Sequence, residues 1–180
     1  MKKIALILAL MMALIVSGCS VEKHEEIEKN NNGEKEVKTV QEISSEEMKK
    51  IDLYVTVMKA AFKEENGGSS FLAVEMDTLE GLSDKGKQEV LNKLKDISEN
   101  VYPFKDVKDE DTKFKQDKNG SLVGSIDGTL LSVKIKEMSD NKAIIVATSW
   151  FGNLGAVFPE YKATYENGKW NLELLSMGIS

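Results

Sequence analysis

Apolar residues between positions 44 and 65 recur at steps of three and four, which is the spacing of one helix face. Ser44-Ser45-Glu46-Glu47 precedes them and has the form of a capping box, with Ser44 reaching forward and Glu47 reaching back to free N–H groups. Asn66-Gly67-Gly68 ends the segment, because glycine readily adopts the left-handed conformation of a helix C-cap. We therefore predict a helix whose core-facing stripe is Met48, Ile51, Val55, Met58 and Phe62, widened by Tyr54 and Ala61.

The middle of the chain predicts a strand, a second helix and an exposed loop. Phe71–Met76 has the composition of a short strand, and Ser83 can cap a helix from about Asp84 to Ile97. Pro103 stops any helical continuation, and the charged segment 105–116 is expected to be an exposed loop. Asn119-Gly120 suggests a turn, followed by a weak strand at Leu122 and Val123. The apolar face of the second helix is Val90, Leu91, Leu94 and Ile97.

The last third of the chain has the period-two alternation of β-strands. Thr129–Glu137 alternates, and Lys142–Phe151 is apolar on both faces, as expected for a central strand. Val157–Glu166 contains Pro159, which belongs near a strand start or on an edge. Asn167-Gly168 predicts a type I′ hairpin into a closing strand, Lys169–Ile179. That strand is expected to bury Trp170, Leu172 and Leu174, then to change to Leu175, Met177 and Ile179 through a bulge near Leu174-Leu175.

Helices placed ahead of an antiparallel meander predict an α+β domain over 44–180, with N-terminal helices packed on a curved antiparallel sheet. This order of elements resembles the cystatin-like and NTF2-like folds. The hairpin from Tyr161 to Trp170, which ends in Tyr-x-Asn-Gly-Lys-Trp, is similar to closing hairpins in small Gram-positive bacterial lipoproteins of that shape. The resemblance implies this fold and a location at the cell surface, and it carries no assigned activity.

The N-terminus has the three parts of a secretory signal peptide. Met1-Lys2-Lys3 is followed by an apolar run, 4–16, that is too short for a permanent membrane span. Val16-Ser17-Gly18-Cys19 resembles a bacterial lipobox at all four positions. That resemblance implies removal of 1–18, diacylglycerol on the Cys19 thiol, and often acylation, for example with palmitate, of the new N-terminus. The alternative is a secreted protein with an unmodified cysteine.

Residues 19–43 are strongly polar and predict a disordered tether between Cys19 and the domain, because such a segment has almost nothing to bury. His24 lies in it and is expected to be a solvated linker residue. The formal charge of −6 becomes −8 when Lys2 and Lys3 are removed with the signal peptide. An acidic chain without a basic cluster is a poor ligand for nucleic acid, and anionic headgroups would repel it, so the lipid must provide the anchor.

The residues needed for common catalytic and metal sites are missing from 44–180. That range contains no histidine and no cysteine, which excludes Ser-His-Asp and Cys-His catalysis and any zinc site that needs those ligands. Asp109-Glu110-Asp111 is expected to be a solvated charge run, so we predict no metal and no cofactor. Glu75 and Asp77, with Glu80 nearby, could form a carboxylate pair of the NTF2-like enzyme type, but alternation places them toward water.

These features favour a non-enzymatic, membrane-anchored extracytoplasmic domain that binds an envelope protein or a small ligand. The predicted contact residues lie in the segment 150–155, where aromatic residues stand beside glycines in a connection: Trp150, Phe151, Asn153 and Leu154. Trp150 and Phe151 could instead complete the core. The alternative function is a small accessory solute-binding component of a transporter. A bilobal solute-binding protein would need two domains and a hinge.

Overall fold

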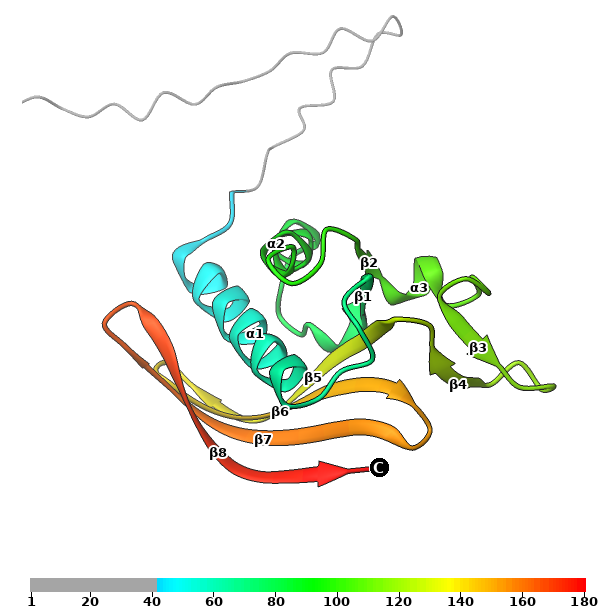
Figure 1. Ribbon diagram of the computed structural model, residues 1–180. Coiled ribbons are helices and arrows are strands. Elements are labelled where there is room, and N and C mark those ends of the chain that lie inside the picture. The colour runs from blue at the N-terminus through cyan, green and yellow to red at the C-terminus, as the bar shows by residue number, and fades with distance from the viewer. Residues whose placement is uncertain (1–41) are drawn as a thin grey trace, which may run out of the picture. The chain divides into compact units, whose positions relative to one another are not determined.

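The structure of the protein is a computed structural model that describes residues 42–180 (Figure 1). The signal peptide 1–18, Cys19, His24 and the tether as far as residue 41 lie outside the described residues. Ile43, at the end of the predicted tether, is half-buried against the core together with Met48. These two residues flank the N-cap Ser44 in the positions of a hydrophobic staple, which fixes how the chain enters the first helix.

Helix α1, Ser45–Glu64, begins as predicted. The Ser44 hydroxyl accepts a hydrogen bond from the Glu47 N–H at 3.1 Å. The prediction that Glu47 reaches back to a free N–H group at the start of α1 is wrong. Its carboxylate instead accepts a hydrogen bond from the Ser83 N–H at 2.7 Å. Hydrogen bonds from the Ser83 side chain and backbone hold the pKa of Glu47 below its usual value. Glu47 therefore joins the start of α1 to the start of the second helix.

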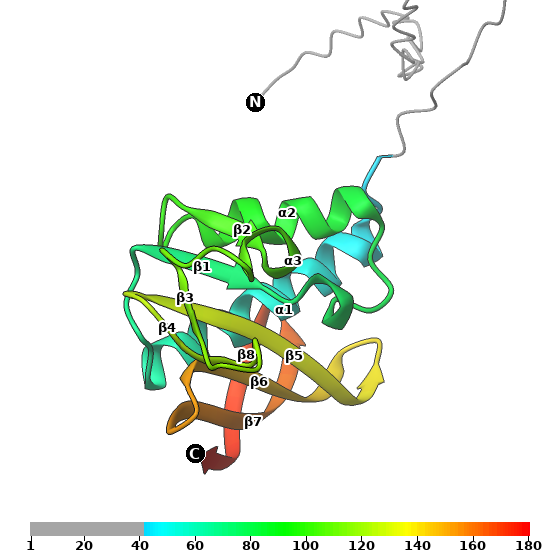
Figure 2. The ribbon, with the colours of Figure 1, turned by 90° about the vertical axis from the view of Figure 1, so that its right-hand side faces the viewer.

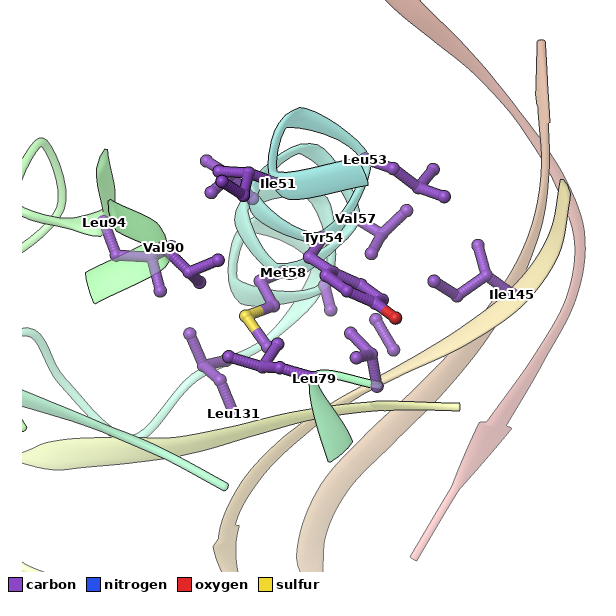
Figure 3. Close-up of a cluster of buried hydrophobic side chains, with 14 of the residues drawn as sticks. Ile51, Leu53, Tyr54, Val57, Met58, Leu79, Val90, Leu94, Leu131 and Ile145 are labelled. Carbon is purple, nitrogen blue, oxygen red and sulfur yellow. The ribbon is translucent and has the colours of Figure 1, made fainter. Parts of the chain in front are cut away.

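Helix α2, Asp84–Leu94, begins at Ser83, whose hydroxyl accepts from the Gly86 N–H at 3.0 Å. It ends one turn before the predicted Ile97. A short 3-10 helix, η1, occupies Met76–Thr78. Helix α1 lies between α2 and the sheet, and its buried surface is wider than the predicted stripe (Figure 3). Leu53 and Val57 point toward Ile145 in the sheet, whereas Ile51 lies on the side of α2, so α1 is buried on two sides (Figure 3).

Four long strands form the predicted antiparallel meander, and both helices lie on one side of it (Figures 1 and 2). Each strand pairs with the next, and β6 is central, as predicted. The meander curves around α1 (Figure 1), so that alternate residues such as Leu131, Ile145 and Ala163 are buried under the helix. Its strands are β5 (Gly128–Ser139), β6 (Lys142–Gly152), β7 (Gly155–Glu166) and β8 (Lys169–Ile179).

The α+β class is confirmed, but the sheet is mixed rather than antiparallel. Strand β1, Phe71–Val74, is shorter than predicted and runs parallel to both β5 and β2, Val101–Pro103. All four residues of β1 are buried, which is the usual condition of a parallel strand covered on both faces. Helix α2 supplies the crossover between β1 and β2. The apolar composition of β1 predicted a strand but did not specify its direction.

The segment predicted as an exposed loop, 105–116, forms secondary structure and contributes to a second buried cluster. It includes most of α3, Phe104–Val107, and all of β3, Phe114–Gln116, which pairs with β4, Leu122–Ser125. Val107 and Phe114 are buried, so the exposed-loop prediction is wrong. Phe71 and Ala73 belong to this second cluster, whereas their neighbours Leu72 and Val74 belong to the α1 core. Because strand side chains alternate between faces, the second cluster lies on the face opposite α1.

Pro159 lies inside β7, a strand paired on both sides, and not near a strand start or on an edge as predicted. The β6–β7 pairs on either side of it are Val146↔Glu160 and Ser149↔Val157, and the pairing is interrupted between them. Since proline has no N–H to donate, this gap is the local cost of placing it in the interior. The proline therefore interrupts the pairing of β7 with β6 but not its pairing with β8.

The β7–β8 hairpin has the predicted turn. Asn167 and Gly168 have φ values of 54° and 77°, as both central residues of a type I′ turn require. The predicted bulge is also confirmed, because Tyr161 pairs with Leu174 and Glu160 with Ser176, leaving Leu175 as the extra residue. The predicted burial of Leu174, Leu175 and Ile179 is wrong, since these side chains are 47%, 47% and 73% exposed. The bulge places Met177 on the same face as Leu174, opposite buried Pro159.

Replacing Gly168 by Val should lower the free energy of unfolding by about 1–3 kcal/mol. No atom lies within 4 Å of the position a Cβ would take, so the cost comes from forcing a β-branched residue to a φ of +77°. Urea unfolding measures this change. Gly168→Asn is the control, because asparagine tolerates positive φ and should unfold close to the wild-type midpoint. Equal midpoints for the two variants would contradict the turn geometry.

Candidate functional site

The predicted binding segment 150–155 is not an open loop: its first three residues end β6, Asn153 and Leu154 form a tight turn, and Gly155 begins β7. Trp150 lies in the second cluster and stacks on Phe114, with ring centroids 6.5 Å apart. Phe151 follows it and points to the opposite face, where a Cβ on Gly155 would come 2.5 Å from Phe151 Cε2. Both aromatic rings are half-buried and fill space between elements. Their packing favours the core interpretation of these two residues.

The other two predicted contact residues remain at the surface of this turn. Asn153 is exposed and its N–H donates to the Val123 carbonyl at 3.1 Å, which ties the turn to β4. Leu154 is 94% exposed, the highest value among the large hydrophobic residues exposed in the described range. The structure therefore separates the four predicted residues. Trp150 and Phe151 support the turn, and Leu154 presents an apolar side chain on it.

Further exposed apolar side chains lie on β7 and β8. Ile179 is opposite Val157, and the Ser180 N–H donates to the Ala156 carbonyl at 3.0 Å, so the end of β8 adjoins the β6–β7 turn (Figure 1). Residues 42–180 expose seven large hydrophobic side chains, and five of them lie on this turn, β7 or β8. We call these five the β8 edge surface: Leu154, Phe158, Leu174, Leu175 and Ile179.

The β8 edge surface includes a free sheet edge, because β8 pairs with β7 alone. Two other edge strands of the described sheet, β2 and β3, have three residues each and contain Pro103 and Lys115, respectively. The part of β5 beyond its pairing with β1 carries Lys134, Lys136 and Glu137. Short length, proline and lysine are the usual means by which proteins prevent edge-to-edge pairing. Strand β8 has eleven residues, and from Leu174 onward it carries no charge. Apart from its bulge, this edge lacks such protection.

A cleft of about 500 Å³ between α1, α2 and the β7–β8 hairpin is a second candidate. Its walls carry both signs of charge, and several of these charges are already paired. Lys59 contacts Asp96 at 2.6 Å and Lys93 contacts Asp52 at 3.1 Å. The hydrogen bond from Lys59 lowers the pKa of Asp96. Because these groups satisfy one another, the cleft holds fewer free partners for a ligand than its volume suggests.

The carboxylates considered for catalysis do not share one environment. Partial burial and the neighbouring Asp77 raise the pKa of Glu75. The pKa of Asp77 is lowered by a hydrogen bond from Lys105, 2.6 Å away. Glu80 is exposed, and neither of the clefts found between α1 and its neighbours is lined by any of the three. The arrangement supplies one carboxyl of raised pKa at a half-buried position.

The remaining acidic run, Asp109-Glu110-Asp111, is exposed, and two of its members contact lysines. Glu110 contacts Lys113, and Asp109 lies 3.8 Å from Lys108. Among residues 42–180, no group of three or more histidine, cysteine or acidic side chains is placed to hold a metal ion. In the same range, no helix has both the length and the apolar character needed to span a bilayer.

The sequence identified Leu154 as a contact residue but assigned Leu174, Leu175 and Ile179 to the interior, because apolar alternation alone does not distinguish an edge strand from a covered one. The missing charge from Leu174 onward was the available signal, in a chain with 30% charged residues. The candidate site therefore rests on the β8 edge surface and on its position at a free edge. Comparisons with protein-family models, curated proteins and solved structures found no match to this chain.

Proposed function

We propose that this protein is a lipoprotein anchored to the extracytoplasmic face of the cell membrane through Cys19. The support is the order of a basic start, a short apolar run and Val16-Ser17-Gly18-Cys19, followed by a polar segment that leads to the folded domain. The domain itself carries no histidine and no cysteine. The anchor would hold it near the membrane while leaving its surface free for partners.

We further propose that the domain acts by binding a protein and not by catalysis. The observation that carries this proposal is the β8 edge surface, where exposed apolar side chains lie beside the free edge of β8, which has no charged side chain from Leu174 onward. Exposed strand edges bind extended segments through main-chain hydrogen bonds, with alternate side chains giving specificity. Neither cleft includes its residues, which favours a protein partner over a small molecule at this surface.

We also propose a cystatin-like or NTF2-like relationship for the curved meander that wraps α1. The meander and the leading helix support this relationship. The parallel β1–β2 pair and the α3–β3–β4 segment are additions to the expected order of elements. The polar cleft favours the alternative function, a small accessory solute-binding component of a transporter, because it is large enough for a small polar solute. Glu75, with its raised pKa, is the residue on which a carboxylate enzyme would depend.

Replacing Cys19 by Ser should abolish lipid attachment, because the thiol is the only cysteine sulfur in the chain. In cells fed radiolabelled palmitate, the wild-type protein should be labelled and recovered with membranes. The variant should be unlabelled, and either released or retained with its signal peptide uncleaved. Ser20→Ala is a matched control that should remain labelled. Label that persists in Cys19→Ser would overturn the lipoprotein proposal.

A further inference from the structure

The free edge of β8 offers backbone hydrogen-bonding groups at defined positions. The Ser180 N–H donates to the Ala156 carbonyl, so Ser180 faces β7. Hydrogen-bonded and non-hydrogen-bonded pairs alternate along an antiparallel ladder, so Gly178 and Ser176 also face β7. The N–H and C=O groups of Met177 and Ile179 then point away from the sheet. Pro159, which has no N–H, lies opposite Met177, as a non-hydrogen-bonded pair allows.

Apolar side chains cover both faces of this edge. On the concave face, Met177 and Ile179 lie opposite buried Pro159 and Val157. On the other face, Phe158 leans over Gly178, and a Cβ built on Gly178 would lie 3.5 Å from Phe158 Cβ and 3.6 Å from Cδ2. An added strand would therefore meet apolar contacts above and below its backbone hydrogen bonds.

Charge permits two copies of this acidic chain to approach at this edge. Residues 174–180 carry no charged side chain. Two carboxylates beside this segment are paired with lysines, since Glu173 contacts Lys162 at 3.1 Å and Glu160 contacts Lys136 at 2.7 Å. A charged partner strand would find no complementary charge here. An apolar strand without charged side chains and with a free edge fits this site, and residues 174–180 of a second copy form such a segment.

We propose that a second copy of this chain pairs antiparallel with β8, with Gly178 of each copy on the twofold axis. Met177 of each copy then lies opposite Ile179 of the other. In both of these pairs, the outward N–H and C=O groups of the two residues hydrogen-bond to each other. This register uses only residues beyond the bulge at Leu175, and no charged residue enters it. The proposal rests on the protein-binding function above and names the partner. Because the paired segment is short, the dimer should be weak in solution.

Because Gly178 lies on the proposed twofold axis, disulfide cross-linking at this residue tests the register directly. Gly178 faces its copy as a non-hydrogen-bonded pair, in which Cα atoms lie about 4.5 Å apart, within the range that a disulfide spans. The contacts around its Cβ are ordinary ones, and its φ is not positive, so cysteine fits there. The protein used is residues 19–180 with Cys19→Ser, which retains every described residue and leaves Gly178→Cys as the sole cysteine. Mild oxidation should give a covalent dimer.

Ser176→Cys in the same background is the matched control. In the proposed register Ser176 lies opposite Ser180, so the two Ser176 positions are far apart along the strands. It should cross-link at least about tenfold more slowly than Gly178→Cys, since its Cα separation exceeds the disulfide range. Equal rates for the two variants would overturn the proposed register. Circular dichroism of each variant confirms that the fold is retained.

Sedimentation of the same unlipidated protein, without added cysteines, measures the non-covalent dimer. Concentration-dependent dimerisation is expected across micromolar to submillimolar protein, and Ile179→Lys should weaken it by about tenfold or more, because a lysine on an edge opposes pairing. Ile179 is 73% exposed, so this variant should fold normally. Met138→Lys is the control, because this exposed residue lies on β5 outside the β8 edge surface, and it should leave the dimer intact. A monomer at every concentration would overturn the proposal and leave an extended segment of another envelope protein as the occupant. Failure of palmitate labelling would overturn only the anchor, since this experiment needs no lipid.

Discussion

Truncating Trp170 to Ala should lower the free energy of unfolding by about 3–5 kcal/mol, the range for a large buried aromatic residue. Trp170 is 6% exposed and lies on the inward face of β8, as its alternation predicts. Its Nε1–H donates to the Lys49 carbonyl at 2.8 Å, and its ring packs on Tyr165 with centroids 5.1 Å apart. The substitution removes the packing and leaves that helix carbonyl without its partner, so two costs combine.

Urea unfolding with matched variants separates these two costs. Trp170→Phe keeps most of the ring but loses the N–H, and should cost about 1–2 kcal/mol through the lost hydrogen bond and a smaller side chain. Trp170→Ala should cost clearly more. A domain with a stability of roughly 5 kcal/mol would then be close to its unfolding threshold under native conditions. A near-wild-type midpoint for Trp170→Ala would contradict the observed packing of β8 against α1.

The elements that could be predicted from the sequence are those specified by residues close together in the chain. The caps at Ser44 and Ser83 depend on hydrogen bonds that span three residues. The Asn167-Gly168 turn depends on two residues that tolerate positive φ. The meander follows from alternation within each strand and from short connections between neighbours. In these cases the local signal and the final structure agree.

The parts that sequence reasoning missed depend on distant partners. Strand β1 takes its parallel direction from β5 and β2, and no feature within its four residues records that choice. Phe114 is buried although charged residues surround it, because Phe71 and Phe104 meet its ring edge-to-face at 5.4 and 5.6 Å. Two apolar residues separated by a charged stretch give no periodic pattern, so the second cluster could not be read from the chain.

The candidate site shows the same limit at the level of a single strand. Leu172 and Leu174 have the same alternation, but Leu172 is half-buried near α1 whereas Leu174 lies on the uncovered part of β8. Which part of a strand the helix covers depends on the length and path of α1, and not on the strand. Trp150 and Phe151 were ambiguous for a similar reason, because their partners Phe114 and Gly155 become neighbours only in the folded sheet.

Adding a single methyl group at Gly128 should destabilise the second cluster by about 3 kcal/mol, at the upper end of ordinary overpacking. Gly128 pairs with Phe71 across the parallel β1–β5 ladder, and a Cβ there would lie 2.5 Å from Phe71 Cζ and closer still to two other ring atoms. The ring cannot move aside easily, because Phe71 is 4% exposed and held edge-to-face against Phe114. Gly128→Ala therefore tests whether the two faces of β1 are packed as described.

Urea unfolding gives the size of the effect, and a second substitution shows its cause. Gly152→Ala is the matched control, since its Cβ would come no closer than 3.5 Å to any neighbour, and it should change the stability by less than about 1 kcal/mol. Phe71→Leu removes most of the ring, so Gly128→Ala should cost much less in that background than in the wild type. The fluorescence of Trp150, followed with Trp170 replaced by Phe, reports the second cluster directly, because these are the only two tryptophans in the chain. If the costs of Gly128→Ala and Phe71→Leu simply add, the ring does not occupy the space above Gly128, and the second cluster must be assembled differently.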